Sequence, residues 1–162
     1  FNPNLYRSGK VCISILNTWK GEQWTSCQSI RSVLLTLVTV LNETPLINEP
    51  GISKAHRDVK RYNEYINYKN YEVAMFNVLS KKCLPTKHIS FYSIIKKHFY
   101  EKKDHIFKKL EKDKEKYNTK AKKLTNGEKC YYQTRIYNMS CLPDYEKLHE
   151  KLQNEFNNIK LK

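Results

Sequence analysis

The sequence predicts a mostly helical chain with the length of about one domain, and two apolar patterns predict it. The first spans residues 30–41, where apolar residues recur at intervals of three and four: Ile30, Val33, Leu34, Leu37, Val38 and Leu41. This spacing places one apolar stripe along a helix. Burying each such side chain stabilises a fold by about 1.5–3 kcal/mol, so we expect this helix to lie against a core. A chain of 162 residues is long enough for one core.

The second pattern runs from Tyr62 to Leu79. Its apolar and aromatic residues share one side of a helix: Tyr68, Tyr71, Met75, Val78 and Leu79. Tyrosines in a row can stack on nucleic-acid bases, but an amphipathic helix that packs on a core explains the same spacing.

For the helix at residues 30–41, Thr25 and Gln28 match a capping box, and Pro45 predicts an end near Glu43.

Further helices are expected in the C-terminal half. Residues 81–88 contain Pro85 and predict a linker, after which Ser90 is expected to cap a third helix. Its inward residues would be Phe91, Ile94, Ile95, Phe99 and Ile106. Residues 102–124 continue in helical pattern, and a final helix after Pro143 has one apolar stripe: Tyr145, Leu148, Leu152, Phe156 and Ile159. We expect this last helix to pack back on the long basic one as an antiparallel hairpin.

The charge and the cysteines limit the class of protein. The net charge of +14, from 30 Lys+Arg and 16 Asp+Glu, is compatible with a nucleic-acid or acidic partner. The basic residues alternate with acidic ones, however, which favours solvated helix faces. The five cysteines form no CxxC pair and show no metal-ligand spacing with His, so no metal or cofactor is expected. An odd number of cysteines suggests free thiols in the cytoplasm or nucleus, and no apolar run suits a membrane span.

The most informative segment lies near the N-terminus. Pro3 between Asn2 and Asn4 predicts a tight turn, because Pro fixes φ and Asn tolerates unusual backbone angles. Cys12 follows Asn4 by eight positions and lies in the apolar run Val11–Leu16. Together these residues present one thiol on a rigid local scaffold, with an asparagine side chain nearby.

These residues resemble the active-site signature of ubiquitin-conjugating enzymes, in which a His-Pro-Asn turn precedes the acceptor cysteine. The resemblance extends to Leu-Asn-Thr-Trp at residues 16–19 and Asn-Glu-Pro-Gly at residues 48–51. It looks closest to the large conjugating enzyme/ligase hybrids of the BRUCE/apollon type. It covers residues 1 to about 106 and, more loosely, the last helix.

The resemblance implies an α+β fold of the ubiquitin-conjugating enzyme type. This fold begins with a helix and a four-stranded antiparallel sheet, neither of which is apparent in the sequence. We therefore expect a mostly helical fragment, with residues 1–80 as the C-terminal half of the catalytic domain. Residues 81–125 would form a long basic helical extension and residues 126–162 a tail with the C-terminal helix. Without the sheet, the stripe at residues 30–41 would need another segment or partner, and the fragment would have little activity.

The resemblance also implies acyl transfer, with Cys12 accepting ubiquitin as a thioester and passing it to a substrate lysine. Asn4 would stabilise the oxyanion, although it could instead brace the turn. Glu49 would orient the lysine and accept its proton, although a plain solvated loop glutamate is the alternative. No dedicated base is needed beside Cys12 for transthiolation, because sulfur is intrinsically nucleophilic.

The sequence departs from the family pattern at two places. Asn2 replaces the usual turn histidine, and the ligase-contacting loop has Ser26 and Cys27 after Trp24 where Pro-Ala is usual. We therefore expect ubiquitin, its activating enzyme and protein substrates as partners, without a separate RING ligase, and no nucleic acid. The competing interpretation is a non-catalytic basic helical module that binds nucleic acid or serves as a protein scaffold.

Overall fold

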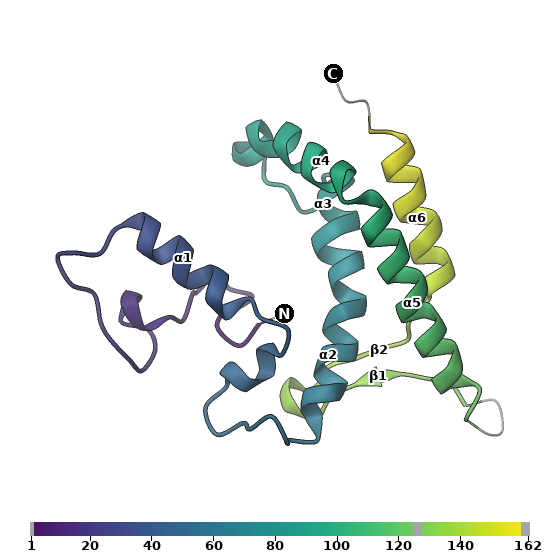
Figure 1. The fold of residues 1–162 in the computed structure, drawn as a ribbon, viewed down its shortest axis with the longest axis horizontal. Coiled ribbons are helices and arrows are strands. Elements are labelled where there is room, and N and C mark those ends of the chain that lie inside the picture. The colour runs from purple at the N-terminus through teal and green to yellow at the C-terminus, as the bar shows by residue number, and fades with distance from the viewer. Residues whose placement is uncertain (1, 125–127, 160–162) are drawn as a thin grey trace. The chain divides into compact units, whose positions relative to one another are not determined.

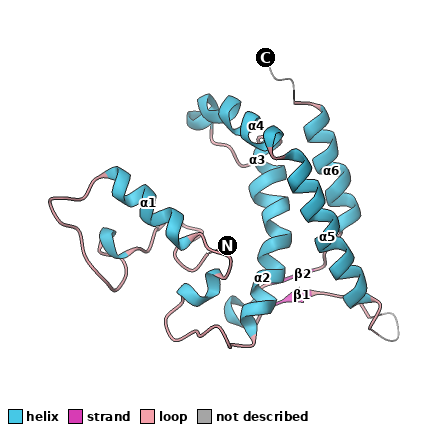
Figure 2. Ribbon diagram, viewed as in Figure 1, coloured by secondary structure: helices cyan, strands magenta, loops and turns pink. Residues whose placement is uncertain are grey.

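The computed structural model describes residues 2–124 and 128–159, and these are mostly helical. Figures 1 and 2 show its helices and short strands: α1 (Ile30–Val40), α2 (Asp58–Lys69), α3 (Asn77–Leu79), α4 (Tyr92–Glu101), α5 (Lys103–Ala121), α6 (Tyr145–Asn157), β1 (Tyr132–Gln133) and β2 (Ser140–Cys141). The two strands pair antiparallel, with Tyr132 opposite Cys141. The prediction of a mostly helical chain is confirmed.

The chain folds as two compact units. Unit 1 contains the residues up to Ile66 together with Thr134–Tyr137, and unit 2 contains Asn67–Gln133 and the residues from Asn138 onward. The predicted domain boundaries at residues 80/81 and 125/126 remain predictions, and residues 125 and 126 lie outside the described residues. Within the described residues, no helix is both long and apolar enough to cross a membrane.

Helix α1 of unit 1 forms where the apolar stripe predicts it, but a different residue caps it. The Ser29 side chain accepts from the backbone N–H of Ser32 at 3.4 Å, and the Ser32 hydroxyl accepts from the Ser29 N–H at 3.3 Å. The predicted cap at Thr25 is wrong, because Thr25 only closes a turn with the N–H of Gln28. The capping box is therefore formed by Ser29 and Ser32, at the start of the apolar stripe of α1.

The apolar face of α1 is exposed. Ile30 is 78 % exposed and Val38 68 % exposed, and no residue of α1 is buried. The prediction that this helix lies against a core is therefore wrong for the described residues, since no described element of unit 1 covers the stripe. The core of unit 1 consists of other side chains: Cys12, Ile13, Ile15, Leu46, Val59, Tyr62 and Ile66.

The second predicted helix is present as a continuous helical run that begins in unit 1 and ends in unit 2. Helix α2 is followed directly by the π-helical segment Asn70–Phe76, which is followed directly by α3. Tyr68 and Tyr71 are buried, and the Tyr71 hydroxyl donates to the Asp113 carboxylate at 3.1 Å. These tyrosines pack inside unit 2 and are not free to stack on bases.

Helices α5 and α6 lie side by side and run in opposite directions (Figure 1). The two helices supply buried apolar residues to the core of unit 2: Ile106, Leu110, Leu148, Leu152 and Phe156. Rings of Phe107 and Phe156 meet edge to face, with centroids 5.5 Å apart. Burial of these apolar side chains stabilises this unit.

Helix α4 differs from the prediction in its start and its inward face. A 3₁₀ turn at Thr86–Phe91 precedes it, and its N-cap, Phe91, has no side-chain capping bond, so the predicted cap at Ser90 is wrong. The Tyr92 hydroxyl donates to the backbone carbonyl of Leu79 and orients that side of the helix inward. Phe91 and Ile94, predicted to point inward, are therefore exposed, whereas Ile106 is buried as expected.

Candidate active site

The Asn-Pro-Asn segment forms the expected turn, and Asn2 holds it to helix α1. The Leu5 N–H donates to the Asn2 carbonyl at 2.9 Å. The Asn2 side-chain oxygen accepts from the Asn4 N–H at 2.8 Å, and its Nδ2 donates to the carbonyl of Val40 at 2.7 Å. Both asparagines are buried. Asn2 therefore satisfies the carbonyl of the last residue of α1, where it would otherwise lack an intrahelical partner.

Asn4 and Cys12 form a reciprocal pair. The Cys12 N–H donates to the Asn4 carbonyl at 2.7 Å, and the Asn4 Nδ2 donates to the Cys12 carbonyl at 2.7 Å. An isolated antiparallel bridge between Leu5 and Val11 continues the pairing. Gly9, at φ 89°, makes the return of the chain possible without strain. The sequence spacing thus places the asparagine side chain directly against the cysteine backbone.

Asn48 is a residue of this site that sequence reasoning missed. Its Nδ2 donates to the Asn4 Oδ1 and to the Val40 carbonyl, both at 3.0 Å. Its own Oδ1 accepts from the Nδ2 of Asn42 at 3.0 Å. An amide network of this kind makes the geometry specific, because breaking one bond leaves a buried polar group unpaired. The signal that the sequence offers is its place in the Asn-Glu-Pro-Gly segment, directly before Glu49.

The side chain of Cys12 is only 2 % exposed in this structure. A thiol that exchanges acyl groups with another protein must be reached by that protein's carbonyl carbon. The local cover over Cys12 must therefore open before any such reaction. Among the other described thiols, Cys130 is also buried, whereas Cys27 and Cys83 are exposed and Cys141 is intermediate.

Glu49 directly follows the 3₁₀ turn Pro45–Asn48 and is partly buried. Its carboxylate Oε2 accepts a hydrogen bond from the Tyr137 hydroxyl at 2.5 Å. The structure thus connects Asn4 with Cys12 directly, and with Glu49 through the adjacent Asn48. Tyr137 was not predicted, because 88 positions separate it from Glu49 in the sequence.

Two tyrosines titrate abnormally beside Glu49. Burial raises the pKa of Tyr62 to about 12, and the Glu49 charge adds to this shift. Partial burial also raises the pKa of Tyr137 above its ordinary value of 10.0, together with the hydrogen bond to Glu49 and the negative charge of that carboxylate. Both hydroxyls therefore stay protonated near neutral pH. They are hydrogen-bond donors there and do not supply a base.

The predicted ligase-contact loop is at the surface. Trp24 is 46 % exposed, and Ser26 and Cys27 are exposed as well. The Trp24 N–H donates to the Asn17 side chain at 3.1 Å, and Asn17 itself has a positive φ of 57°. An exposed indole on an ordered loop is suited to contact another protein.

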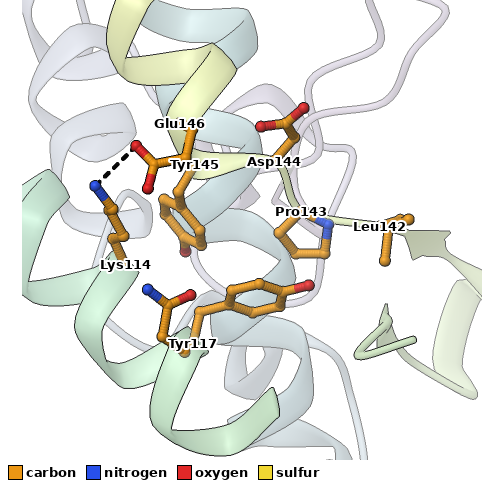
Figure 3. A pocket seen from close by; sticks show the side chains of 8 residues that line it. Lys114, Tyr117, Leu142, Pro143, Asp144, Tyr145 and Glu146 are labelled. Atoms are coloured by element: carbon orange, nitrogen blue, oxygen red, sulfur yellow. Dashed lines mark hydrogen bonds and ion pairs between the residues drawn. The ribbon is translucent and has the colours of Figure 1, made fainter. Parts of the chain in front are cut away.

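Unit 2 contains a separate open cavity of about 410 Å³ between α5 and the start of α6 (Figure 3). Its lining residues are Lys114, Tyr117, Asn118, Leu142, Pro143, Asp144, Tyr145 and Glu146. Lys114 forms ion pairs with Glu146 at 2.9 Å and Glu111 at 3.6 Å. The hydrogen bond to Glu146 raises the pKa of Lys114 above its ordinary value. Because its cation is already paired and none of the predicted site residues lines it, this cavity is a weaker candidate than the Cys12 site.

The family comparison agrees with the site in unit 1. Residues 1–73 match the family model described as ubiquitin-conjugating enzyme. This stretch holds the Asn2–Asn4 turn, Cys12, Asn48 and Glu49. By this partial homology, residues 1–73 are similar to ubiquitin-conjugating enzymes.

Among curated proteins, the chain is similar to ubiquitin-conjugating enzyme E2 Z. It is 46% identical to the Homo sapiens protein over 85 residues, which cover 51% of this chain and 24% of that protein. For the Danio rerio protein the values are 42% over 103 residues, 62% of this chain and 31% of that protein. The chain thus spans about a quarter to a third of the length of these relatives.

The hybrid branch is a more distant relative. The dual E2 ubiquitin-conjugating enzyme/E3 ubiquitin-protein ligase BIRC6 of Homo sapiens is 34% identical over 122 residues, which cover 68% of this chain and 2% of that protein. The match over residues 1–73 therefore supports the predicted family for that part of the chain. The prediction that the hybrid branch is closest is not supported, because the identity to E2 Z is higher.

Proposed function

We propose that this chain accepts ubiquitin as a thioester on Cys12 and transfers it to a substrate lysine. The observation that supports this most is the reciprocal Asn4–Cys12 pair, with both hydrogen bonds at 2.7 Å, inside the residues that match the family model. The proposal includes a catalytic-domain half at residues 1–80, a basic helical extension at residues 81–125 and a tail at residues 126–162.

In the first step the Cys12 sulfur attacks the C-terminal carbonyl of ubiquitin, which arrives as a thioester on the activating enzyme. A new C–S bond forms, and the bond to the sulfur of the activating enzyme breaks. The free energy of this exchange is close to zero, because one thioester replaces another and one thiolate replaces another. It needs access to the buried Cys12 sulfur more than it needs a strong base.

In the second step a lysine amine attacks the same carbonyl, and the C–N bond replaces the C–S bond to Cys12. The intermediate carries a negative oxygen, and one preorganised donor aimed at such an oxygen contributes about 2.7–4 kcal/mol. Asn4 is the proposed donor. Its Nδ2 carries two hydrogens, of which the bond to the Cys12 carbonyl uses one. Glu49 is the proposed acceptor for the ammonium proton of the lysine.

The proposed partners are ubiquitin, its activating enzyme and protein substrates. The exposed loop with Trp24, Ser26 and Cys27 is the proposed contact surface for a ligase or for a substrate bound directly. The name of BIRC6 describes a combination of conjugating-enzyme and ligase activity in that protein. We extend it to this chain as part of the proposal.

A non-catalytic basic module is the second candidate, favoured by the net charge of +14. In α5, however, Lys109, Lys114 and Lys116 all form ion pairs with acidic side chains. Paired lysines release fewer counterions on binding a phosphate backbone, so we expect weak nucleic-acid binding. A steep loss of nucleic-acid affinity between low and physiological salt would favour this candidate.

A charging assay tests the proposal with the full-length protein, activating enzyme, ATP and ubiquitin. We expect an adduct that a thiol reductant removes, and no such adduct with Cys12→Ala. Cys83→Ala is the matched control, because Cys83 is exposed and lies in unit 2. An unchanged adduct in Cys12→Ala would contradict the proposal.

A further inference from the structure

A short segment from late in the chain belongs to the unit that contains Cys12. Residues Thr134–Tyr137, called here the return segment, are part of unit 1. The backbone N–H groups of Arg135 and Ile136 both donate to the same carboxylate oxygen of Asp58, each at 2.8 Å. A carboxylate that accepts two backbone bonds holds a segment more firmly than neutral contacts do.

The anchor is buried and lies near a basic side chain. Asp58 is 0 % exposed, and its second oxygen lies 4.0 Å from the Arg61 guanidinium. The Thr134 hydroxyl donates to the Ile136 carbonyl at 2.6 Å, which closes the return segment on itself. Burying a carboxylate without such partners would be costly, so this arrangement fixes the segment in one place.

The anchored segment ends in Tyr137, whose backbone is unusual. Its φ of 62° and ψ of 5° lie in the left-handed region, which non-glycine residues seldom adopt. Its half-exposed ring lies against that of Tyr62, with centroids 6.2 Å apart. In this conformation its hydroxyl donates to Glu49 Oε2. Conformations of this kind cluster at functional sites, where surrounding contacts enforce them.

We propose that Tyr137 is a positioning residue for the transfer of ubiquitin to an amine: its hydroxyl fixes Glu49 Oε2, so that the other oxygen receives the proton of the incoming lysine. This inference rests on the proposed function. The proton passes from the lysine ammonium to Glu49 and then to solvent. The Tyr137 hydroxyl keeps its own proton throughout and makes no bond to substrate.

The role predicts a dependence on the nucleophile. A lysine side chain arrives protonated and needs a placed acceptor, whereas hydroxylamine is largely unprotonated at neutral pH and needs none. A change that only disturbs the fold would slow both reactions. A change that only misplaces the carboxylate would slow lysine alone.

The test follows single-turnover discharge of the purified ubiquitin thioester of the full-length protein. For Tyr137→Phe we expect lysine discharge to slow roughly 10- to 100-fold, since small misplacements of a reacting group can have such effects. Hydroxylamine discharge and charging should be unchanged. Tyr131→Phe, which removes the hydroxyl of an exposed tyrosine in unit 2, should match the wild type with both nucleophiles.

A double-mutant cycle with Glu49→Gln completes the test. If Tyr137 acts through Glu49, then Tyr137→Phe adds no further loss in the Glu49→Gln background. Three outcomes would overturn this inference and leave the proposed function standing. Tyr137→Phe could discharge to lysine at the wild-type rate, it could slow discharge to hydroxylamine equally, or its loss could add to that of Glu49→Gln. A wild-type protein that forms no thioester would overturn the proposed function, and this inference with it.

Discussion

Three asparagine side chains hold the cysteine segment in place. Asn2 and Asn48 both donate to the Val40 carbonyl, and both contact Asn4, which donates to Cys12. Asn2 stands where the family usually has histidine, and here it is a turn brace. The substitution therefore leaves the support of the turn intact, because the amide supplies both a donor and an acceptor at that position.

The two proposed roles of Asn4 can be separated by Asn4→Asp. This variant keeps the size and an acceptor for Asn48 but removes the Nδ2 donor and with it the bond to the Cys12 carbonyl, so the ratio of the effects on the two steps separates the roles. We expect lysine discharge to fall about 10²- to 10³-fold, as for loss of one oxyanion donor, with a much smaller effect on charging. Single-turnover rates of charging and of lysine discharge measure the two effects.

Asn48→Ala is the matched control for Asn4. It removes a brace of Asn4, with a stability cost of about 1–3 kcal/mol for the unpaired groups, but leaves the proposed donor in place. It should change charging and discharge by similar factors. Equal loss of both steps in Asn4→Asp would show that Asn4 is only a brace.

At the scale of elements, Asp58 joins the start of α2 to the return segment. Burial by itself raises the pKa of this carboxyl, but the hydrogen bonds from Ile136 and Arg135 and the charges of Arg61 and His56 outweigh it. The pKa therefore lies below the ordinary value of 3.8. A lowered pKa in the folded state means that the ionised form stabilises the fold. This contribution is fully present above pH 3.8 and is lost as the pH falls through the lowered pKa.

Asp58→Asn should therefore destabilise the protein more at neutral pH than in acid. We expect a loss of about 1–3 kcal/mol in the free energy of unfolding near pH 7, because two backbone donors lose a charged acceptor. The loss should shrink near pH 2. Urea unfolding at both pH values measures it, with Glu22→Gln as an exposed control. An equal loss at both pH values would contradict the assigned role of the charge.

At the scale of the whole molecule, the two units differ in where their apolar residues lie. Helix α6 buries Tyr145, Leu148, Leu152 and Phe156, whereas α1 buries none of its residues. Hydrophobic burial is the main stabilising contribution to a fold. The packing of α5 with α6 should therefore carry more of the stability than helix α1 does.

A pair of identical substitutions tests this difference. Leu152 is fully buried and Leu34 is 58 % exposed. In the 162-residue chain, Leu152→Ala should lower the free energy of unfolding by about 2–5 kcal/mol. Leu34→Ala should change it by no more than about 0.5 kcal/mol. Denaturant unfolding of both variants gives the comparison. A large cost for Leu34→Ala would show that the α1 stripe is covered.

Local patterns predict the helices and the Cys12–Asn4 pair, because both depend on short spacings. The stripe at residues 30–41 gives α1, and the eight-residue interval brings Asn4 to Cys12. Sequence patterns give the type of an element but not its surroundings, so the exposure of Ile30 and Ile94 was not predicted. Contacts such as Asp58 with Arg135 and Glu49 with Tyr137 join residues 77 and 88 positions apart, and no local pattern encodes them.

The measurement that tests the central claim most directly is the identity of the residue that carries ubiquitin. The full-length Cys12→Ser variant should form an adduct that resists thiol reductants but is cleaved by hydroxide, since an oxygen ester replaces the thioester. Mass spectrometry should locate the modification at position 12. A reductant-sensitive adduct in this variant, or modification at exposed Cys27 or Cys83, would contradict the assignment of Cys12 as the acceptor.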